Sequence, residues 1–275
     1  MNFVIGSNGR IGKKLVSTHS FKNITTIDRS IYDKWYSYGA LDKISKYFES
    51  WAGTGDTIYI VAGVLDPLES EELHELVNFV LPKNIINGTL KHGLKVVTFG
   101  TIMDQFVDDK STNPYFKSKK KLSTFIDQYH NKNYLLNIKL HTLFGGGPPN
   151  KHMFLGEVLH SISTNTLFKM TSGNQLREYH YIDDEIRAIK KLIDSNVSGQ
   201  INLSHGDPIY LKDLAKHIFH ELGCPQLLSI GSINETRSDN FNIVFNRPAE
   251  LQDINFRDSE LAVVKYLKTY LKMKH

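Results

Sequence analysis

The sequence predicts an α/β protein built on a doubly wound parallel sheet. Short runs rich in β-branched residues recur at 3–5, 24–27, 56–62 and 94–99. Segments with helical spacing of apolar residues separate most of these runs, a pattern typical of a parallel sheet covered by helices on both faces. The first run is followed at once by three regularly spaced glycines. We therefore expect the chain to be organised around its first strand and the turn after it.

Length, composition and charge describe an ordinary globular chain. The 275 residues can bury a sizeable core, and 40% hydrophobic with 23% charged residues is typical of soluble proteins. Cys224 is the only cysteine, which excludes a disulfide within the chain, and the twelve histidines show no metal-ligand spacing, so no metal is expected. The basic cluster around Lys119 lacks interleaved stacking aromatics, so no nucleic-acid partner is expected. Without a signal peptide or an apolar run of membrane-spanning length, we expect a cytoplasmic protein with no membrane partner.

The turn after the first strand has the sequence of a dinucleotide site. Gly6 permits a tight turn, Gly9 allows the backbone to approach phosphates, and Gly12 allows close packing of helix on strand. N–H groups at the start of the next helix would face the anion. The spacing Gly-x-x-Gly-x-x-Gly differs from the Gly-x-Gly-x-x-Gly of ordinary Rossmann dehydrogenases. The sequence still predicts a Rossmann-type sheet, with cofactor contacts from Gly6, Ser7, Asn8, Gly9, Arg10, Ile11 and Gly12.

The second strand, 24–27, ends on Asp28 and Arg29. An acid at this place accepts hydrogen bonds from the adenosine ribose and favours NAD. Arg29 and Arg10 favour NADP instead, because a guanidinium pairs well with a ribose phosphate. Both cofactors stay open, and either predicts an adenosine site here. Ala62 and Gly63, at the end of the third strand, are expected beside the same cofactor.

The candidate catalytic residues stand at the start of a helix predicted from Tyr115 to Gln128. Pro114 suits the first turn of a helix, so Tyr115 and Lys119, four residues apart, share one face. We expect the lysine ammonium to lower the pKa of the phenol from its usual value of about 10, so that it exchanges a proton near neutral pH. Thr101, with Thr98 as the alternative, is expected to hold the reacting oxygen.

Taken together, these motifs resemble the extended short-chain dehydrogenase/reductases, and among them the enzymes that act on nucleotide-diphosphate sugars. The resemblance runs almost end to end. It covers the glycine turn, the strands 56–62 and 96–101, the helix with Asn78 and 84–86, the pair Tyr115 and Lys119, residues 202–204, 206 and 211–214, and Arg247-Pro248. It also covers the segment 177–184, Arg-Glu-Tyr-His-Tyr-Ile-Asp-Asp, which is similar to the family's Arg-x-Phe-x-x-Val-Asp-Asp.

The resemblance also implies a division of the chain and further site residues. It implies a dinucleotide-binding domain of residues 1–143 plus about 176–204, and a smaller, interleaved carboxyl-terminal substrate lobe of residues 144–175 and 205–275. Asp183 and Asp184 would be structural in such a protein. The implied roles are catalysis for Tyr115, Lys119 and Thr101, cofactor binding for Asn78, Tyr115 and Lys119, and substrate binding for Thr98, Lys151, Arg177 and Arg247.

The resemblance implies reduction of a nucleotide-diphosphate-linked 4-keto sugar, with hydride from NADH or NADPH and a proton from Tyr115. NADPH is slightly favoured for a reductase. Ile102 and Met103 stand where the 4,6-dehydratases of the family carry Asp-Glu, and the chain is closer in length to the 4-ketoreductases than to the epimerases. A 4-epimerase with retained NAD and a non-catalytic NAD(P)-sensing protein are the alternatives. A homodimer through two long helices is a further expectation from the family.

Overall fold

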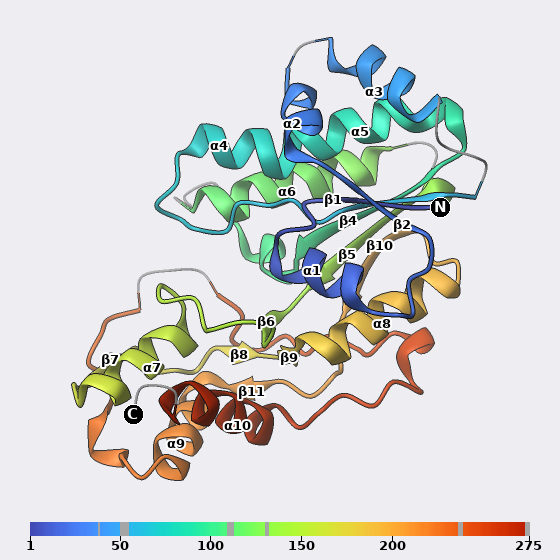
Figure 1. The fold of residues 1–275 in the computed structure, drawn as a ribbon. Coiled ribbons are helices and arrows are strands. Elements are labelled where there is room, and N and C mark those ends of the chain that lie inside the picture. Colours follow the sequence, from blue (N-terminus) through green and yellow to red (C-terminus); the bar gives the residue numbers. More distant parts are fainter. Residues whose placement is uncertain (38, 50–54, 109–112, 130–131, 236–238, 273–275) are drawn as a thin grey trace. The chain divides into compact units, whose positions relative to one another are not determined.

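The computed structural model describes residues 1–37, 39–49, 55–108, 113–129, 132–235 and 239–272 (Figure 1). These residues form two compact units: unit 1 is Met1–Leu140 with Ala188–Leu203, and unit 2 is His141–Arg187 with Ser204–His275. The predicted division placed residues 176–187 in the dinucleotide-binding domain, and this was wrong. The strands of that segment pair with strands of unit 2, so the boundary falls later, inside a helix.

Unit 1 is built on a sheet in which all neighbouring strands run parallel. Within the described residues the order is β10-β5-β4-β3-β1-β2. This confirms the predicted α/β class. The order reverses between β1 and β3, and the crevice at such a reversal is where ligands bind in open parallel sheets. The strands are β1 (Asn2–Ile5), β2 (Ile24–Ile27), β3 (Thr57–Ile60), β4 (Lys95–Thr101), β5 (Leu135–Leu140) and β10 (Gly199–Leu203).

Helices cover both faces of this sheet. In Figure 1, α3, α5 and α6 lie on one face and α1 lies on the other. Apolar residues have helical spacing over 41–51. The helix α3 there runs from Ala40 to Glu49, and residues 50 and 51 lie outside the described residues. The helices are α1 (Arg10–Ser17), α2 (Arg29–Tyr32), α3 (Ala40–Glu49), α4 (Glu71–Glu75), α5 (Leu81–Thr89), α6 (Pro114–Gln128) and α8 (Ile182–Asp194), the last of which contains the unit boundary.

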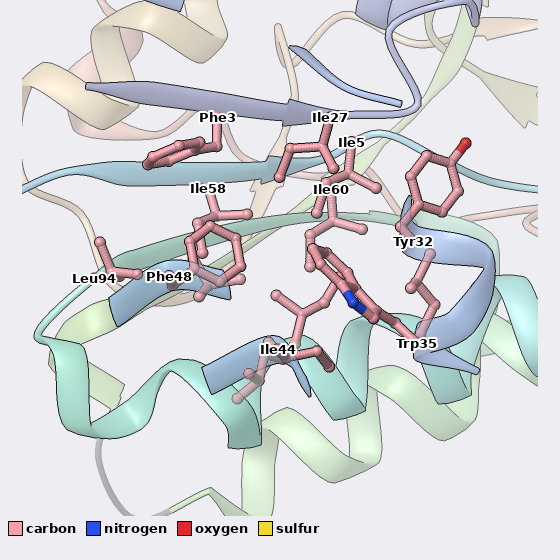
Figure 2. Packing of buried hydrophobic residues seen from close by; sticks show 14 of the residues in the cluster. Phe3, Ile5, Ile27, Tyr32, Trp35, Ile44, Phe48, Ile58, Ile60 and Leu94 are labelled. Carbon is pink, nitrogen blue, oxygen red and sulfur yellow. The ribbon is translucent and has the colours of Figure 1, made fainter. Parts of the chain in front are cut away.

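The core of unit 1 explains why the short strands hold their places. Figure 2 shows Phe3 and Ile58 from adjacent strands packed with Ile44 and Phe48 of α3. Phe3 and Phe48 meet edge to face, with ring centroids 5.3 Å apart. All four side chains are fully buried. Burial of a side chain of this size contributes about 1.5–3 kcal/mol, so this layer stabilises the packing of α3 on the sheet.

The helical segment that carries Asn78 is interrupted by a π-helical turn, Leu76–Val80, between α4 and α5. The Leu81 N–H donates to the Leu76 carbonyl, five residues back. A proline inside a helix usually kinks or breaks it. Proline lacks the N–H for the usual bond four residues back, and the wide turn directly before it takes up this mismatch. Pro82 therefore lies in the first turn of α5, directly after the π-helical turn.

The described residues of unit 2 form the helices α7, α9 and α10, the beginning of α8, and three two-stranded ladders. The parallel ladders are β6–β9 and β7–β12, and β8–β11 is antiparallel. Its core gathers Phe144, Phe168 and Phe219 around α9 and α10. The elements are β6 (Thr142–Phe144), α7 (Phe154–Thr164), β7 (Phe168–Met170), β8 (Leu176–Arg177), β9 (Tyr179–Tyr181), β11 (Ile209–Tyr210), α9 (Leu211–Glu221), β12 (Leu228–Ile230) and α10 (Ser259–Lys272). The last helix, α10, begins at Ser259. Among the described residues no helix is both long and apolar enough to cross a bilayer.

Candidate active site

The glycine turn has the geometry that a dinucleotide requires. Gly6 has a φ of +90°, and a Cβ there would lie 2.3 Å from the Ala62 backbone nitrogen. A Cβ on Gly12 would lie 2.4 Å from the Gly6 carbonyl oxygen. Gly9 by contrast has no neighbour closer than 3.5 Å to such a Cβ, so its outer side is open to a ligand. Two glycines are thus needed for packing and the third leaves room, as the sequence predicted.

The end of α1 adds the electrostatic part of this site. α1 begins at Arg10, and its cap residue, Gly9, offers no side chain to bond the first N–H groups. Such an end attracts anions through N–H groups and the helix dipole. Ser7, Asn8 and Ile11 complete the same turn, between β1 and α1. A pyrophosphate therefore fits the residues present.

The residues directly after β3 pack against the glycine turn. The backbone N–H groups of Val61 and Ala62 both donate to the Ile5 carbonyl, at 2.9 Å each. This places Ala62 directly against Gly6. Gly63 follows, with space for a Cβ limited only by the Asn78 side chain at 3.4 Å. The structure therefore brings Ala62 and Gly63 to the expected edge of the sheet.

At the end of β2, Asp28 and Arg29 are both exposed, and each has a local partner. Asp28 caps α2, since its Oδ1 accepts from the N–H and hydroxyl of Ser30 at 2.9 and 2.7 Å. These bonds hold the pKa of the Asp28 carboxyl below its usual value. The Arg29 Nε donates to Asp33 at 3.2 Å. The carboxylate thus stays ionised at the strand end, while the guanidinium is directed along its own helix.

The predicted helix start at Tyr115 is formed by a strong cap. Asn113 Oδ1 accepts from the N–H of Tyr115 at 3.0 Å and of Phe116 at 3.4 Å, and Pro114 occupies the first position. Asparagine before proline is a favourable helix start. The cap fixes Tyr115 in the first turn of α6, on the same face as Lys119 one turn later.

The structure brings Tyr115, Lys119 and Thr101 together at the end of β4. Lys119 is buried, and its Nζ donates to the Phe99 carbonyl at 2.7 Å while lying 6.0 Å from the centre of the Tyr115 ring. Thr101 is the last residue of β4, and its side chain is hydrogen-bonded to Tyr115. A hydroxyl, a phenol and an ammonium thus converge as the sequence predicted.

The expected effect of Lys119 on Tyr115 was wrong. Burial, followed by the negative charge of Asp104, raises the pKa of Tyr115 to about 12, and the Thr101 hydrogen bond only partly opposes this. Burial lowers the pKa of Lys119 to about 8, against the attraction of Asp104. The ammonium is directed to the Phe99 carbonyl instead of the phenol oxygen. Tyr115 is therefore a protonated phenol at neutral pH.

The structure does not present the Thr98 hydroxyl at the sheet edge, where the alternative hydroxyl and a substrate contact were expected. It is 1% exposed, and its Oγ1 donates to Asn137 Oδ1 at 2.9 Å inside the sheet. The side chains of successive strand residues alternate between faces, and Thr98 lies three residues before the edge. Thr101 is the hydroxyl that the strand presents beside Tyr115.

Asn78 ties the loop after β3 to the helices that carry the site. Its amide bonds both the N–H and the carbonyl of Val64, at 2.9 Å each, and donates to Ser118 Oγ at 3.1 Å. His74 continues this network, because its Nε2 bonds the Asp66 carbonyl at 2.9 Å and its ring packs against Tyr115 at 6.4 Å. Asn78 is thus a structural tether here, and a direct cofactor contact stays a prediction.

The candidate diphosphate residues lie in unit 2. Arg177 bonds the Leu176 carbonyl and pairs with Asp239 at 2.6 Å, and Arg247 bonds the carbonyls of Leu251 and Ile254. Both guanidiniums therefore hold local structure, and their role toward a substrate stays a prediction. Lys151 is exposed and lines a surface groove before α7.

Asp184 is structural, as expected for the 177–184 segment. It is buried, and it accepts from the Arg187 Nη2 at 2.9 Å and from the Arg257 N–H at 2.9 Å. Asp183 lies near Arg257, at 3.7 Å between Oδ2 and Nη2. The pair of carboxylates thus joins α8 to the segment before α10.

A buried ion cluster in unit 2 was not predicted. The His180 ring is held between Glu185 at 2.6 Å and Glu178 at 2.9 Å. Burial disfavours its charge, but the attraction and hydrogen bonds of the two carboxylates raise the pKa of His180 to about 9. His141 and His205 stack on either side at 5.3 and 4.7 Å, and burial lowers their pKa values to about 3 and about 4.

This cluster has the residue types of a metal site but not the geometry of one. Glu178, His180 and His205 place one nitrogen or oxygen each within 4.8 Å of one another. The stacked rings are inclined by only 25° and 26°, so their nitrogen lone pairs do not converge on one point. Both nitrogens of His180 also face carboxylates. The arrangement is that of an internal ion triad, with histidinium at its centre.

A sequence profile of the NAD dependent epimerase/dehydratase family matches residues 2–204. The match spans most of the chain, including the glycine turn and the six strands of the unit 1 sheet. The chain belongs to this family. The predicted resemblance to extended short-chain dehydrogenase/reductases is thereby confirmed, as is the predicted class of cofactor, a nicotinamide dinucleotide. A search of curated proteins found no match.

Solved structures of similar fold include enzymes with different activities. A UDP-glucuronic acid 4-epimerase from Bacillus cereus, in complex with UDP-glucuronic acid and NAD, has a TM-score of 0.75 at 14% identity, with 100% of each chain covered. A dTDP-4-dehydrorhamnose reductase from Clostridium acetobutylicum has a TM-score of 0.71 at 18% identity, with 98% of this chain and 99% of that chain covered. A second such reductase, from Bacillus anthracis and in complex with NADP, gives 0.73 at 16% identity, with 98% of each chain covered. At these identities the likeness establishes the fold.

Proposed function

We propose that this protein is an NAD(P)H-dependent reductase of a nucleotide-diphosphate-linked 4-keto sugar. The observation that carries the proposal is a half-buried phenol, Tyr115, hydrogen-bonded to Thr101 and held in the acid form at neutral pH. A carbonyl reduced by hydride needs a proton on its oxygen, and a protonated phenol is the group that supplies it. The similar structures of reductases and epimerases that act on nucleotide sugars support the substrate class.

In the proposed mechanism the protein positions a carbonyl and protonates it. The nicotinamide, when bound, supplies the hydride. The Thr101 hydroxyl orients the carbonyl oxygen, and Tyr115 donates its phenolic proton to the same oxygen. Lys119, anchored by the Phe99 carbonyl, holds positive charge beside the phenol and offers its remaining N–H donors to the nicotinamide ribose. The glycine turn and the start of α1 bind the pyrophosphate.

The raised pKa of Tyr115 favours the reductive direction. At a pKa of about 12, about one phenol in 10⁵ is ionised at pH 7. Removal of a proton from a sugar hydroxyl, with which an epimerase or a dehydrogenase begins, needs that rare phenolate. Protonation of a keto oxygen uses the abundant form. Ile102, which is buried, and Met103 offer no carboxylates for a dehydration.

The test is turnover by a tyrosine variant. The oxidation of NADH or NADPH is followed by absorbance, with UDP-, dTDP- and GDP-linked 4-keto sugars as substrates. We expect Tyr115→Phe to lower kcat about 100- to 10,000-fold while cofactor affinity stays nearly unchanged. Tyr134→Phe is the matched control, since Tyr134 is half exposed and outside the site. Undiminished turnover in Tyr115→Phe, or no reduction of any 4-keto sugar nucleotide, would refute the proposal.

A 4-epimerase is the second candidate, favoured by the fold of the B. cereus enzyme. It would use the same residues but retain its nicotinamide through oxidation and re-reduction. Purified protein would then carry bound NAD and interconvert sugar nucleotides without net loss of added NADPH. A protein that only senses NAD(P) would bind cofactor and turn over nothing, which the same panel distinguishes.

The choice between NAD and NADP depends on the end of β2. Asp28 is exposed and ionised there, which favours the free ribose hydroxyls of NAD. Arg29 is paired with Asp33 but stays 71% exposed, so its guanidinium could turn to a ribose phosphate. For a reductase that consumes its cofactor, we propose NADPH as the slightly better candidate, with NADH as the alternative.

A further inference from the structure

A buried carboxylate, Asp104, lies next to the proposed reacting pair without belonging to it. Asp104 is in the 3₁₀ turn Ile102–Phe106, three residues after Thr101, and is 2% exposed. A buried carboxylate is unfavourable unless it is paired and hydrogen-bonded. Nothing in the proton transfer itself uses this group, so its place in the interior needs another explanation.

The partners of Asp104 come from two elements of unit 1. Its Oδ1 accepts from Lys139 of β5 at 3.1 Å, and its Oδ2 accepts from the Ser123 hydroxyl of α6. Both side chains of the ion pair are buried, at 12% and 2% exposure. The carboxylate is therefore bonded at both oxygens and is fixed relative to β5 and α6.

Position along α6 links Asp104 to the reacting pair. Ser123 lies one helical turn beyond Lys119, which itself lies one turn beyond Tyr115, so all three share a face of α6. Asp104 bonds the last of the three. Its negative charge acts on the other two, raising the pKa of both Tyr115 and Lys119.

Gly100 makes room for this arrangement. Gly100 of β4 stands opposite Lys139 of β5, and a Cβ there would lie 3.2 Å from both the Lys139 Cγ and the Asn137 Nδ2. The missing side chain lets the Lys139 stem run past the strand toward Asp104. The sequence around β4 thus supplies the hydroxyl, the gap and the carboxylate within five residues, 100–104.

We propose that Asp104 is a positioning residue whose fixed carboxylate keeps Lys119 an ammonium in the buried site, beside the acid form of Tyr115. Burial alone would favour the neutral amine of Lys119, and a neutral amine no longer places positive charge beside the phenol. The proposal rests on the proposed function, because it takes Tyr115 and Lys119 as the reacting pair.

Other charged groups around α6 do not replace Asp104. Glu71 and Glu75 of α4 pair with Lys117 and Lys121 at 3.5 and 2.8 Å, near the surface. His74 faces the Tyr115 ring, and both of its ring nitrogens are bonded within the Asn78 network. The described residues of the π-helical turn and of β10 that pack on α6 carry no titratable side chains.

The first test measures Lys119 directly and needs no substrate. The protein is labelled with ¹³C at the lysine Cε, and the Lys119 resonance, assigned by Lys119→Met, is followed by NMR over pH. We expect Asp104→Asn to move its titration to lower pH by about half a pH unit or more. Asp104→Glu should restore most of the wild-type midpoint. Asp127→Asn, an exposed acid on the same helix, is the matched control and should leave it unchanged.

A second variant covers the case in which Asp104→Asn does not fold. Lys139→Met removes the cation that offsets Asp104 and should move the Lys119 titration in the opposite direction, to higher pH. Unchanged midpoints in Asp104→Asn, or a lower midpoint in Lys139→Met, would overturn the proposal.

The pH profile of turnover gives a second, separable readout. In Asp104→Asn the alkaline limb of kcat/KM should move to lower pH by the same amount as the Lys119 midpoint, because loss of either proton stops the reduction. An unmoved limb would refute the role in turnover. If no 4-keto sugar nucleotide is reduced by the wild-type protein, the proposed function fails, while the NMR titration still decides whether Asp104 controls Lys119.

Discussion

The ion triad of unit 2 predicts a pH-dependent loss of stability when its central ring is removed. The perturbation is His180→Gln, which leaves Glu178 and Glu185 buried without the cation between them. His180 has a pKa of about 9 in the folded protein against an ordinary value of 6.5, because both carboxylates outweigh the effect of burial. This difference corresponds to about 3 kcal/mol of folding free energy. Breaking a buried pair by removal of one partner costs a similar amount, about 3–5 kcal/mol.

The sign of the pH dependence follows from the direction of the pKa change. The folded pKa is raised, so the stabilisation is fully present below pH 6.5 and is lost as the pH rises through about 9. The difference in unfolding free energy between the wild type and His180→Gln should therefore be largest near pH 6.5 and should decrease as the pH approaches about 9. Urea unfolding, followed by circular dichroism at both pH values, measures this difference in unfolding free energy.

The control and the refuting result are both specific. His220→Gln removes a histidine whose side chain is 80% exposed and should change little at either pH. Tryptophan fluorescence gives an internal comparison, because both tryptophans belong to the segments of unit 1. A loss below about 1 kcal/mol in His180→Gln, or a loss of equal size at both pH values, would refute the reasoning about a buried histidinium.

Four further substitutions test the strand-end hydroxyl, the end of β2 and the glycine turn. Thr101→Val should lower kcat by about 100-fold. Thr98→Val should leave kcat nearly unchanged and lower the unfolding free energy by about 1–2 kcal/mol, because its hydrogen bond to Asn137 is lost. Equal effects of the two substitutions on kcat would contradict the assignment of Thr101 as the reacting hydroxyl. Asp28→Asn should raise the ratio of kcat/KM for NADPH over NADH about tenfold by removing charge repulsion, and an unchanged ratio would place the adenosine ribose elsewhere. Gly12→Val should abolish the rise in Tm on adding cofactor, because its Cβ would lie 2.4 Å from the Gly6 carbonyl oxygen; a normal rise would contradict the close packing.

Much of unit 1 could be predicted because its signals are local. A β-branched run followed by Gly6 and Gly12 specifies a strand, a turn and a helix within a dozen residues, and Asn113-Pro114 specifies the start of α6. In each case the residue types meet a backbone requirement that is visible in the sequence itself. The pairing of Tyr115 and Lys119 on one face followed from helix geometry alone.

The direction of a side chain could not be predicted in the same way. Spacing placed Lys119 beside Tyr115 but could not show that its ammonium reaches the Phe99 carbonyl, and so the predicted pKa change of Tyr115 had the wrong sign. Asp104 was missed because its partners, Ser123 and Lys139, are 19 and 35 residues away. An acid three residues after a strand-end hydroxyl is the only local signal it gives.

The division of the chain was misjudged for a related reason. The strands β8 and β9 have two and three residues, too short for a periodic pattern. Their partners, β11 and β6, are distant in sequence. Only the pairing assigns residues 176–187 to unit 2, and sequence spacing carries no information about it.

The wide turn at Leu76–Val80 amounts to one surplus residue inserted in an otherwise regular helix. Deletion of Asn78 would restore a regular α-helix. It would also remove the side chain that, among the described residues, hydrogen-bonds both the N–H and the carbonyl of Val64. The deletion variant should therefore keep its fold, while the loop after β3 that contains Val64 loses its hydrogen bonds to the helix. The π-helical turn therefore interrupts its own helix but fixes the loop after β3.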